Sequence, residues 1–163
     1  MQLSEAGLDL IKRSEGFRER VYADVTGTAT IGYGHRLLAH EEFSEGVSET
    51  QAEAMLRVDV HGAEQAVGWL VKVPLTQGQF DALTDFCFNL GSGRLASSTM
   101  LKVLNGGRYE AAREQLLLWD LAGGEVQAGL KARREAESVL WGGAAAAELV
   151  QEVSSPSPGV LAA

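Results

Sequence analysis

The sequence predicts an α+β fold that is predominantly helical. We expect a small N-terminal lobe with a helix and a β-hairpin, an all-α C-terminal lobe, a long helix that joins them and a cleft between them. Three observations predict this arrangement. Residues 20–47 lack a helical period and hold short runs typical of strands. Apolar residues recur at helical spacing over about 49–71. From residue 74 onward, apolar helical segments alternate with glycine-rich breaks.

The composition limits the class of protein. The 163 residues are 45% hydrophobic and 22% charged, which is ordinary for one globular domain. We expect that domain to span residues 1–143 and to be a monomer. Cys87 is the only cysteine, so no disulfide forms within the chain. The net charge of −8 argues against nucleic acid as a partner. No apolar run reaches membrane-spanning length and residues 1–5 do not resemble a signal peptide, so we expect neither membrane insertion nor a signal peptide.

The N-terminal lobe is predicted over about residues 1–47. Ser4 can cap its first helix, which ends near Glu15 because Gly16 is a good residue to follow a helix. The sequence then predicts a strand at 21–23, a turn at 24–27 and a second strand at 28–31. A third short strand has room within 36–47.

A capping box predicts where the connecting helix begins. Ser48 and Gln51 have the required spacing, so a helix of about 49–71 follows, and Pro74 ends it. This helix is longer than the average globular helix and can span from one lobe to the other.

The helical lobe is predicted over about residues 74–141. Thr76 and Gln79 match a second capping box and open a helix of about 77–90. That helix is apolar nearly all round, which is typical of the central buried helix of a lobe.

Three more segments complete the chain. Ser98 can cap a further helix, and another is expected over 109–119. Residues 144–163 are rich in Ala, Ser and Pro, and we expect a tail that is ordered only in part. The last amphipathic helix is predicted at 126–141, with four residues facing the core: Val126, Leu130, Val139 and Leu140.

Glu15, Asp24 and Thr30 lie on one helix–turn–hairpin unit that can direct all three into the cleft. Glycoside hydrolysis usually requires two carboxyl groups, one protonated and one ionised. Glu15 suits the acid role because it ends a helix, where the dipole disfavours a negative charge. Asp24 suits the ionised role on a polar turn, and the Thr30 hydroxyl can help it orient a water molecule. The spacing alone is weak, because two solvated surface carboxylates are the default interpretation. The Thr-x-Gly-x-Gly context, which fixes the local backbone, favours a site.

The stretch E-G-F-R-E-R-V-Y-A-D-V-T-G-T-A-T-I-G-Y-G-H (15–35) closely resembles the catalytic signature of phage-type lysozymes, the endolysins of glycoside hydrolase family twenty-four. That signature is Glu, eight residues, Asp or Cys, five residues, Thr, then Ile-Gly-x-Gly. The resemblance continues in three later blocks: F-C-F-N-L-G (86–91), S-S-T-M-L-K-V-L-N (97–105), and W-D-L-A-G-G followed by G-L-K-A-R-R-E-A-E (119–137).

The resemblance implies a lysozyme-like fold and hydrolysis of the β-1,4 bond between N-acetylmuramic acid and N-acetylglucosamine in peptidoglycan, with inversion. It implies Glu15 as general acid and Asp24 and Thr30 as the pair that activates and holds water. It also implies that Phe88 lines the sugar cleft, although core packing is equally open. We predict that Gly34 is a second substrate contact.

His35 is predicted to pair with Asp59, which ties the hairpin to the long helix and raises the pKa of His35. A role for His35 in proton transfer is the alternative. One of Arg133 and Arg134 can reach the cleft near Glu15, although a solvated helix face is the default for both. No spacing of His, Cys, Asp and Glu matches a metal site, so we predict no metal and no cofactor.

Three other functions stay open from the residues: a lytic transglycosylase, which needs the acid but not the water-holding pair, a non-catalytic glycan-binding domain and a chitin hydrolase. The resemblance further implies synthesis in a host cytoplasm, action on the cell wall after release and functional dependence on a holin.

Overall fold

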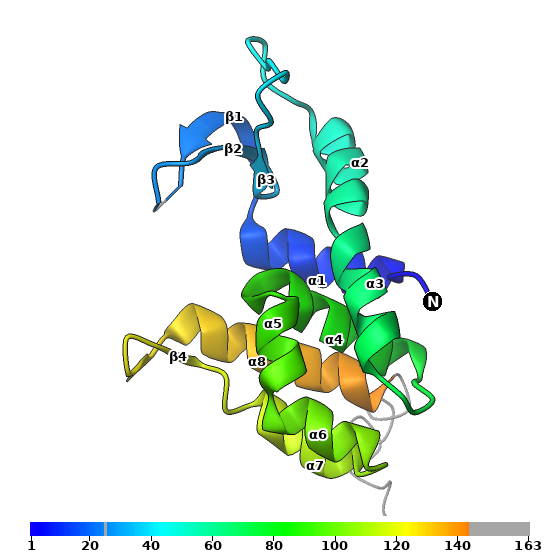
Figure 1. Ribbon diagram of the computed structural model, residues 1–163. Coiled ribbons are helices and arrows are strands. Elements are labelled where there is room, and N and C mark those ends of the chain that lie inside the picture. Colours follow the sequence, from blue (N-terminus) through cyan, green and yellow to red (C-terminus); the bar gives the residue numbers. More distant parts are fainter. Residues whose placement is uncertain (25, 144–163) are drawn as a thin grey trace, which may run out of the picture.

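The computed structural model describes residues 1–24 and 26–143. In chain order the elements are α1 (Glu5–Glu15), β1 (Arg18–Ala23), β2 (Ala29–Gly32), β3 (His35–Arg36), α2 (Glu49–Asp59), α3 (His61–Leu70), α4 (Gln77–Leu90), α5 (Ser92–Ser97), α6 (Thr99–Asn105), α7 (Tyr109–Leu116), β4 (Leu121–Ala122), β5 (Glu125–Val126) and α8 (Ala128–Gly142). A lobe with the β1–β3 sheet and a larger helical lobe are joined through α2 and α3 (Figure 1). The predicted two-lobed, predominantly helical α+β fold is confirmed. The predicted tail lies outside the described residues.

The first helix begins and ends where the sequence predicts. The Ser4 hydroxyl accepts a hydrogen bond from the backbone N–H of Gly7 and caps α1. Gly16 ends the helix with a φ of 72°, a conformation that glycine adopts at little cost. Leu8 and Ile11 are buried with residues of the sheet, but α1 also packs against α4 and α8. Residues 1–47 therefore do not form a separate lobe, because their first helix contacts both lobes.

The sheet holds β1, β2 and β3 in that order, and both pairs of strands are antiparallel. Tyr22 in β1 lies opposite Thr30 in β2, and Asp24 follows the end of β1. The third strand follows directly after the bend at Gly34, one residue before the range of 36–47 in which it was expected. The hairpin therefore places Asp24 at its turn and Thr30 on its inner strand.

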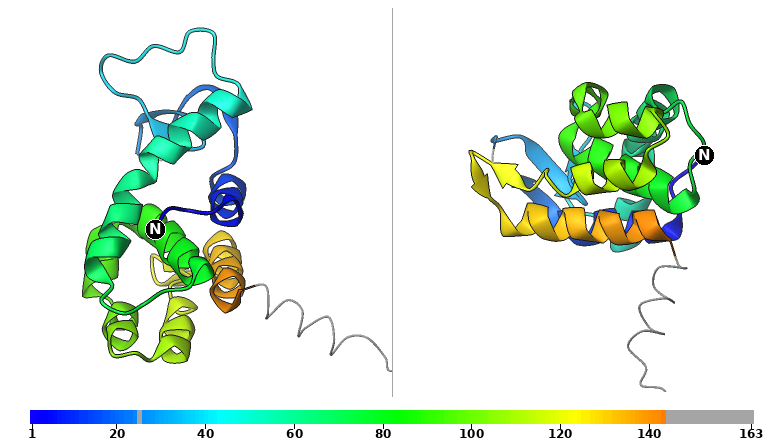
Figure 2. Two further views of the ribbon diagram at one scale, coloured as in Figure 1. Left: turned by 90° about the vertical axis from the view of Figure 1, so that its right-hand side faces the viewer. Right: turned by 90° about the horizontal axis from the view of Figure 1, so that it is seen from below.

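The predicted connecting helix is two helices rather than one. The capping box of Ser48 and Gln51 forms as predicted, but α2 ends at Asp59 and α3 begins at His61. Val60 has a ψ of −16°, and its carbonyl accepts hydrogen bonds from N–H groups three and four residues later. The break falls in Val58-Asp59-Val60-His61-Gly62, where every residue has a low helix propensity. The two helices still carry the chain from one lobe to the other (Figure 2, left).

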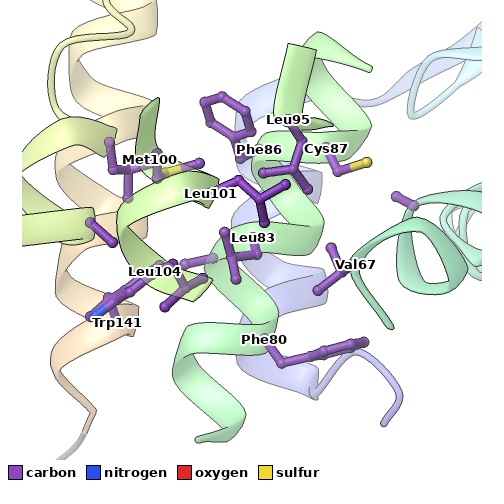
Figure 3. Close-up of a cluster of buried hydrophobic side chains, with 14 of the residues drawn as sticks. Val67, Phe80, Leu83, Phe86, Cys87, Leu95, Met100, Leu101, Leu104 and Trp141 are labelled. Carbon is purple, nitrogen blue, oxygen red and sulfur yellow. The ribbon is translucent and has the colours of Figure 1, made fainter. Parts of the chain in front are cut away.

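The central helix of the larger lobe is α4, as predicted. Thr76 and Gln79 form its capping box, and Gly91 follows its last residue. Its apolar side chains are buried among residues of α3, α5, α6, α7 and α8, and the labelled members of this cluster surround α4 (Figure 3). A smaller apolar cluster lies between α1, the sheet and α2. Phe88 packs at the edge of both clusters.

The buried face of the last helix is not the one that the sequence predicts. Val126 lies before α8, in the β4–β5 hairpin, and Val126 and Val139 are 58% and 63% exposed. The hairpin turns at two glycines with positive φ, and it delays the start of the helix to Ala128. The residues that α8 buries are mostly polar: Arg133, Arg134, Glu137, Ser138 and Trp141. A hydropathy pattern misses this face because it assigns charged residues to the surface. Over residues 1–24 and 26–143, no helix has both the length and the apolar character needed to cross a membrane.

Candidate active site

A cavity of about 660 Å³ lies between the two lobes. Its walls come from the end of α1, the bend before β3, the end of α2 and the end of α4. The lining residues are Glu15, Gly34, His35, Arg36, Leu38, Asp59, Phe88, Asn89, Leu90 and Gly91. Five of the seven residues singled out in the sequence therefore line one cavity. Asp24 and Thr30 are outside this lining.

Glu15 is the last residue of α1, and its side chain is 26% exposed. Its Oε1 accepts a hydrogen bond of 2.8 Å from Nη1 of Arg133, which comes from α8. Gly34 covers the other carboxylate oxygen: a Cβ at this position would lie 3.4 Å from Oε2 of Glu15. The φ of Gly34 is 84°, so the backbone there also favours glycine. Glu15 is thus held on one side by a guanidinium group and faces Gly34 on the other.

Arg133 is held from behind by Asp85 of α4, which is fully buried. Nε and Nη2 of Arg133 donate to the Asp85 carboxylate at 3.0 and 2.6 Å. Such a bidentate contact fixes the plane of the guanidinium group and leaves Nη1 directed at Glu15. Burial alone lowers the pKa of Arg133, but the bonds and charges of Asp85 and Glu15 outweigh burial and raise it. Arg133 therefore stays positively charged beside Glu15.

Arg134 contacts the same cavity by a second route. Its Nη2 donates a hydrogen bond of 2.9 Å to Oδ1 of Asn89, which lines the cavity. The same Nη2 lies 2.8 Å from Oε1 of Glu137. The guanidinium group lies over the ring of Phe86, 5.0 Å from its centroid. The default expectation of a solvated helix face is wrong for both arginines, because Arg133 and Arg134 are buried.

Asp24 is organised by its own turn. Its Oδ1 accepts three hydrogen bonds, from the hydroxyl and N–H of Thr26 at 2.6 and 2.8 Å and from the N–H of Thr28 at 2.9 Å. Its Oδ2 lies 3.8 Å from Nη2 of Arg36, a residue of the cavity wall. The hydroxyl of Thr26 first, then the N–H of Thr28, hold the pKa of Asp24 below its usual range, and Arg36 adds to the effect. Asp24 therefore stays ionised into acidic solution.

Thr30 is 3% exposed and donates its hydroxyl proton to the carbonyl of Thr28 at 3.0 Å. The backbone of Thr28 thus joins the two residues, because its N–H binds Asp24 and its carbonyl binds Thr30. Arg36 connects this hairpin group to the cavity, since it faces Asp24 and lies opposite Thr30 across the sheet. The structure therefore places the Asp24–Thr30 group beside the cavity that Glu15 lines.

His35 lies between two carboxylates. Its Nδ1 is 2.8 Å from Oδ2 of Asp59, at the end of α2, and its Nε2 is 3.0 Å from Oε2 of Glu41. Glu41 also accepts the N–H of Leu38. Burial lowers the pKa of His35, but Glu41 and then Asp59 outweigh burial, and the pKa is raised. Both ring nitrogens face acceptors, which favours a charged imidazole with a bonding role.

The comparisons with known proteins agree with this geometry. The family model described as "Phage lysozyme" matches residues 12–137, a range that holds all ten lining residues of the cavity and Arg133. The chain belongs to the phage lysozyme family. Among its relatives, the endolysin of Bacillus phage B103 is 41% identical over 96% of this chain and 60% of that protein. The endolysin of Salmonella phage P22 is 37% identical over 86% of this chain and 98% of that protein.

Solved structures of the phage lysozyme fold superpose on the chain. A P22 lysozyme variant matches with a TM-score of 0.79 at 36% identity, over 86% of this chain and 98% of that one. The muramidase domain of SpmX from Asticaccaulis excentricus matches with a TM-score of 0.78 at 39% identity, over 86% of this chain and 97% of that domain's chain. The chain spans only 60% and 55% of the length of the endolysins of Bacillus phages B103 and PZA.

Sequence reasoning missed several residues of this phage lysozyme site. Asp85 lies in a helix that the sequence predicts to be apolar nearly all round, and Glu137 lies on a helix face for which solvation is the default. The i, i+3 and i, i+4 spacing of Arg134 and Arg133 to Glu137 was the available signal. No sequence signal pointed to Glu41, because its contact with His35 depends on the path of an irregular loop.

Proposed function

We propose that this phage lysozyme family member is an endolysin that hydrolyses the β-1,4 bond between N-acetylmuramic acid and N-acetylglucosamine in peptidoglycan. The observation that carries the proposal is Glu15, a half-buried carboxyl group fixed in the wall of an inter-lobe cavity of about 660 Å³. A cavity of that size lies within the usual range of ligand sites and has room for part of a glycan strand.

In this proposal Glu15 is the general acid. It donates a proton to the leaving glycosidic oxygen as the bond to the anomeric carbon breaks. Arg133 and Gly34 limit the rotamers of Glu15, so the proton is presented from one fixed position. Such positioning lowers the entropy lost on reaching the transition state.

Asp24 and Thr30 are proposed to handle the attacking water. Oδ1 of Asp24 is already occupied by three donors, so Oδ2 is the oxygen that accepts a proton from water. The proton of the Thr30 hydroxyl is committed to the carbonyl of Thr28, so Thr30 offers water a lone pair. A water that donates to both residues turns its own lone pair toward the anomeric carbon. That geometry leads to inversion at that carbon.

Phe88 and Gly34 are proposed to contact the sugars. Phe88 lines the cavity and also packs at the junction of the two apolar clusters, so cleft lining and core packing are compatible. His35 and Asp59 are proposed to be a structural pair that holds the bend of Gly34 against α2. The imidazole of His35 and the carboxylate of Asp59 bind each other, so neither is proposed to donate a proton to the substrate.

The decisive experiment compares Glu15→Gln with the wild type in a turbidity assay on outer-membrane-permeabilised cells. Glu42→Gln, an exposed residue in the same lobe, is the matched control. We expect Glu15→Gln to lose lysis with an unchanged melting temperature, and Glu42→Gln to retain it. A fully active Glu15→Gln would remove Glu15 from the mechanism and overturn the proposal.

The products separate the competing reactions. Hydrolysis gives reducing ends, and NMR of the first product anomer reports inversion or retention. Anhydro-sugar ends would instead indicate a lytic transglycosylase, and binding without any cleavage would indicate a glycan-binding domain. Cleavage of chitin in place of peptidoglycan would change the substrate but leave the roles of Glu15 and Asp24 intact.

We further propose that the protein is a monomer with one domain over residues 1–143, and that it waits in the host cytoplasm until a holin opens the membrane. Relatives from bacteriophage PS119 and Escherichia phage Mu carry the name SAR-endolysin and match 78% and 74% of this chain. Expression with and without a holin tests the release route: lysis without the holin would contradict it. Sedimentation tests the oligomeric state.

A further inference from the structure

A buried chain of charged groups runs behind the cavity and reaches it at both ends. At one end Glu15 is bonded to Arg133, which is bonded to Asp85. At the other end Asn89 is bonded to Arg134, which lies 2.8 Å from Glu137. Arg133 and Arg134 are neighbours on α8. The proposed general acid is therefore one end of a network that extends through the helical lobe.

Glu137 is fully buried. It is 0% exposed, as are Asp85 and Arg134. Among the described residues, neither carboxylate oxygen of Glu137 has a hydrogen-bond partner of good geometry, and the same holds for Nε and Nη1 of Arg134. The 2.8 Å contact between them is thus an ion-pair approach rather than a well-aligned bond. An ionised Glu137 would be poorly satisfied where it lies.

The charges of the network balance only if it holds one proton. Arg133 and Arg134 contribute two positive charges, whereas the carboxyl groups of Glu15, Asp85 and Glu137 contribute three negative charges when all are ionised. A net charge inside a protein is unfavourable, because the charged group has been taken out of water. One bound proton removes that charge, and either Glu15 or Glu137 can carry it without breaking the bidentate contact of Asp85.

Burial decides which carboxyl group carries the proton at rest. The Glu15 side chain is 26% exposed and is bonded to Arg133, whereas Glu137 has no contact with solvent. Burial first, then the negative charge of Asp85, raise the pKa of Glu137 well above its usual range. Arg134 and Arg133 oppose this shift but do not cancel it.

We propose that Glu137 is a positioning residue that carries this one proton in the resting protein. It thereby leaves Asp85 ionised, and Asp85 holds Arg133 on Glu15. This inference rests on the proposed function of Glu15 as general acid. It adds that the network is neutral in two forms, one with Glu137 protonated and one with Glu15 protonated and Glu137 ionised. The second form is the one that can act on the glycosidic bond.

Glu137→Gln tests the proposal because an amide has the shape of the protonated acid but cannot ionise. Since the amide brings no charge to the network, protonation of Glu15 in this variant leaves the network with a net positive charge. We expect the variant to match the wild type within about twofold at acidic pH. We expect the alkaline limb of its pH–rate profile to move down by about half a pH unit, a threefold loss on that side.

The proton itself has a spectroscopic signature that needs no activity. Infrared spectra of the wild type at neutral pH should contain a carbonyl band of a buried carboxylic acid. Glu137→Gln should remove this band. Glu15→Gln should keep the band but lose it at a lower pH than the wild type, because the network without the Glu15 charge is neutral when Glu137 is ionised. Glu135→Gln, an exposed glutamate on the same helix, is the matched control and should change neither the band nor the pH–rate profile. If Glu137→Gln fails to fold, Glu137→Asp replaces it and should keep a shifted band.

Two results would overturn the inference. The first is the lack of a carboxylic acid band that depends on Glu137. The second is an equal loss of rate at every pH in Glu137→Gln, which would reveal only a packing role. A failure of the proposed function looks different: the wild type would not cleave peptidoglycan, while the infrared band would still report the proton on Glu137.

Discussion

Arg133 donates a hydrogen bond of 2.8 Å to Glu15, although the two residues are 118 positions apart in the chain. The contact joins the end of α1 to α8, the last described helix, and it exists only when the helical lobe has assembled around α4. Glu15 is thus positioned by the complete fold. The hairpin that carries Asp24 is by contrast organised within its own turn, so the two proposed carboxyl groups depend on different parts of the structure.

Replacing Arg133 should affect both stability and activity. Arg133→Met leaves Asp85 buried without its partner, and we expect the free energy of unfolding to fall by about 3–5 kcal/mol in denaturant titrations. Arg133→Lys keeps the charge but cannot bond Asp85 twice and reach Glu15. It should fold better than Arg133→Met yet lose about 100-fold in lysis rate, because Glu15 is no longer fixed. Lys131→Gln, an exposed change on the same helix, is the control. Wild-type activity in Arg133→Lys would contradict the positioning role.

Gly34 should be intolerant of even one methyl group. Gly34→Ala places a Cβ 3.4 Å from Oε2 of Glu15 at a φ of 84°. Gly124→Ala is a matched control, because its φ is 85° and no atom lies within 4 Å of the added Cβ. Both variants should lose about 1–2 kcal/mol of stability to the left-handed backbone. Only Gly34→Ala should also lose activity, by about tenfold, because its methyl group fills space beside the Glu15 carboxyl in the cavity wall. Equal activities in the two variants would show that the close approach has no catalytic consequence.

The local parts of the site were predictable from the sequence, whereas its buried support was not. A cap at Ser4 and a glycine after Glu15 fix one helix end, and a turn fixes Asp24, so these positions follow from short-range rules. Asp85 and Glu137 obey no such rule. Hydropathy patterns assign charged residues to the surface, and only the assembled helices show that Asp85 and Glu137 lie beside Arg133 and Arg134 in the interior. The sequence also predicts one helix where the structure has a break at Val60. The apolar period continues through this segment, and helix propensity alone is too weak a guide to predict the break.

The turn around Asp24 should control activity in acid. Thr26→Val removes the hydroxyl that does most to lower the pKa of Asp24. The pKa should rise toward its ordinary value, and the base should be lost at a higher pH as the solution is acidified. The acidic limb of the pH–rate profile should therefore move up. Thr28→Val is the control, because it keeps the backbone N–H bond to Asp24 and removes only a hydroxyl that bonds the Thr26 hydroxyl at 3.0 Å, so its acidic limb should move less than that of Thr26→Val. An acidic limb that moves equally in both variants would mean that turn stability, rather than the Thr26 hydroxyl, sets the profile.

The His35 bridge should make stability depend on pH. The folded protein raises the pKa of His35 through Glu41 and Asp59, so folding favours the protonated imidazole. The stabilisation is complete below the ordinary histidine pKa of about 6.5 and is lost as the pH rises through the raised value. The melting temperature of the wild type, relative to that of His35→Gln, should therefore be highest in mildly acidic buffer and should converge with it in alkaline buffer.

Single replacements of its two partners show how the bridge is built. Asp59→Asn and Glu41→Gln should each remove part of the pH-dependent difference in melting temperature, and the double variant should remove nearly all of it. His61→Gln is the control, because that imidazole side chain is 62% exposed and its polar partners among the described residues, Glu64 and Gln65, lie on its own helix. Because Glu41 comes from the loop and Asp59 from the end of α2, a loss confined to Asp59→Asn would show that the loop contact contributes nothing. The bend at Gly34 would then be held against α2 by Asp59 alone.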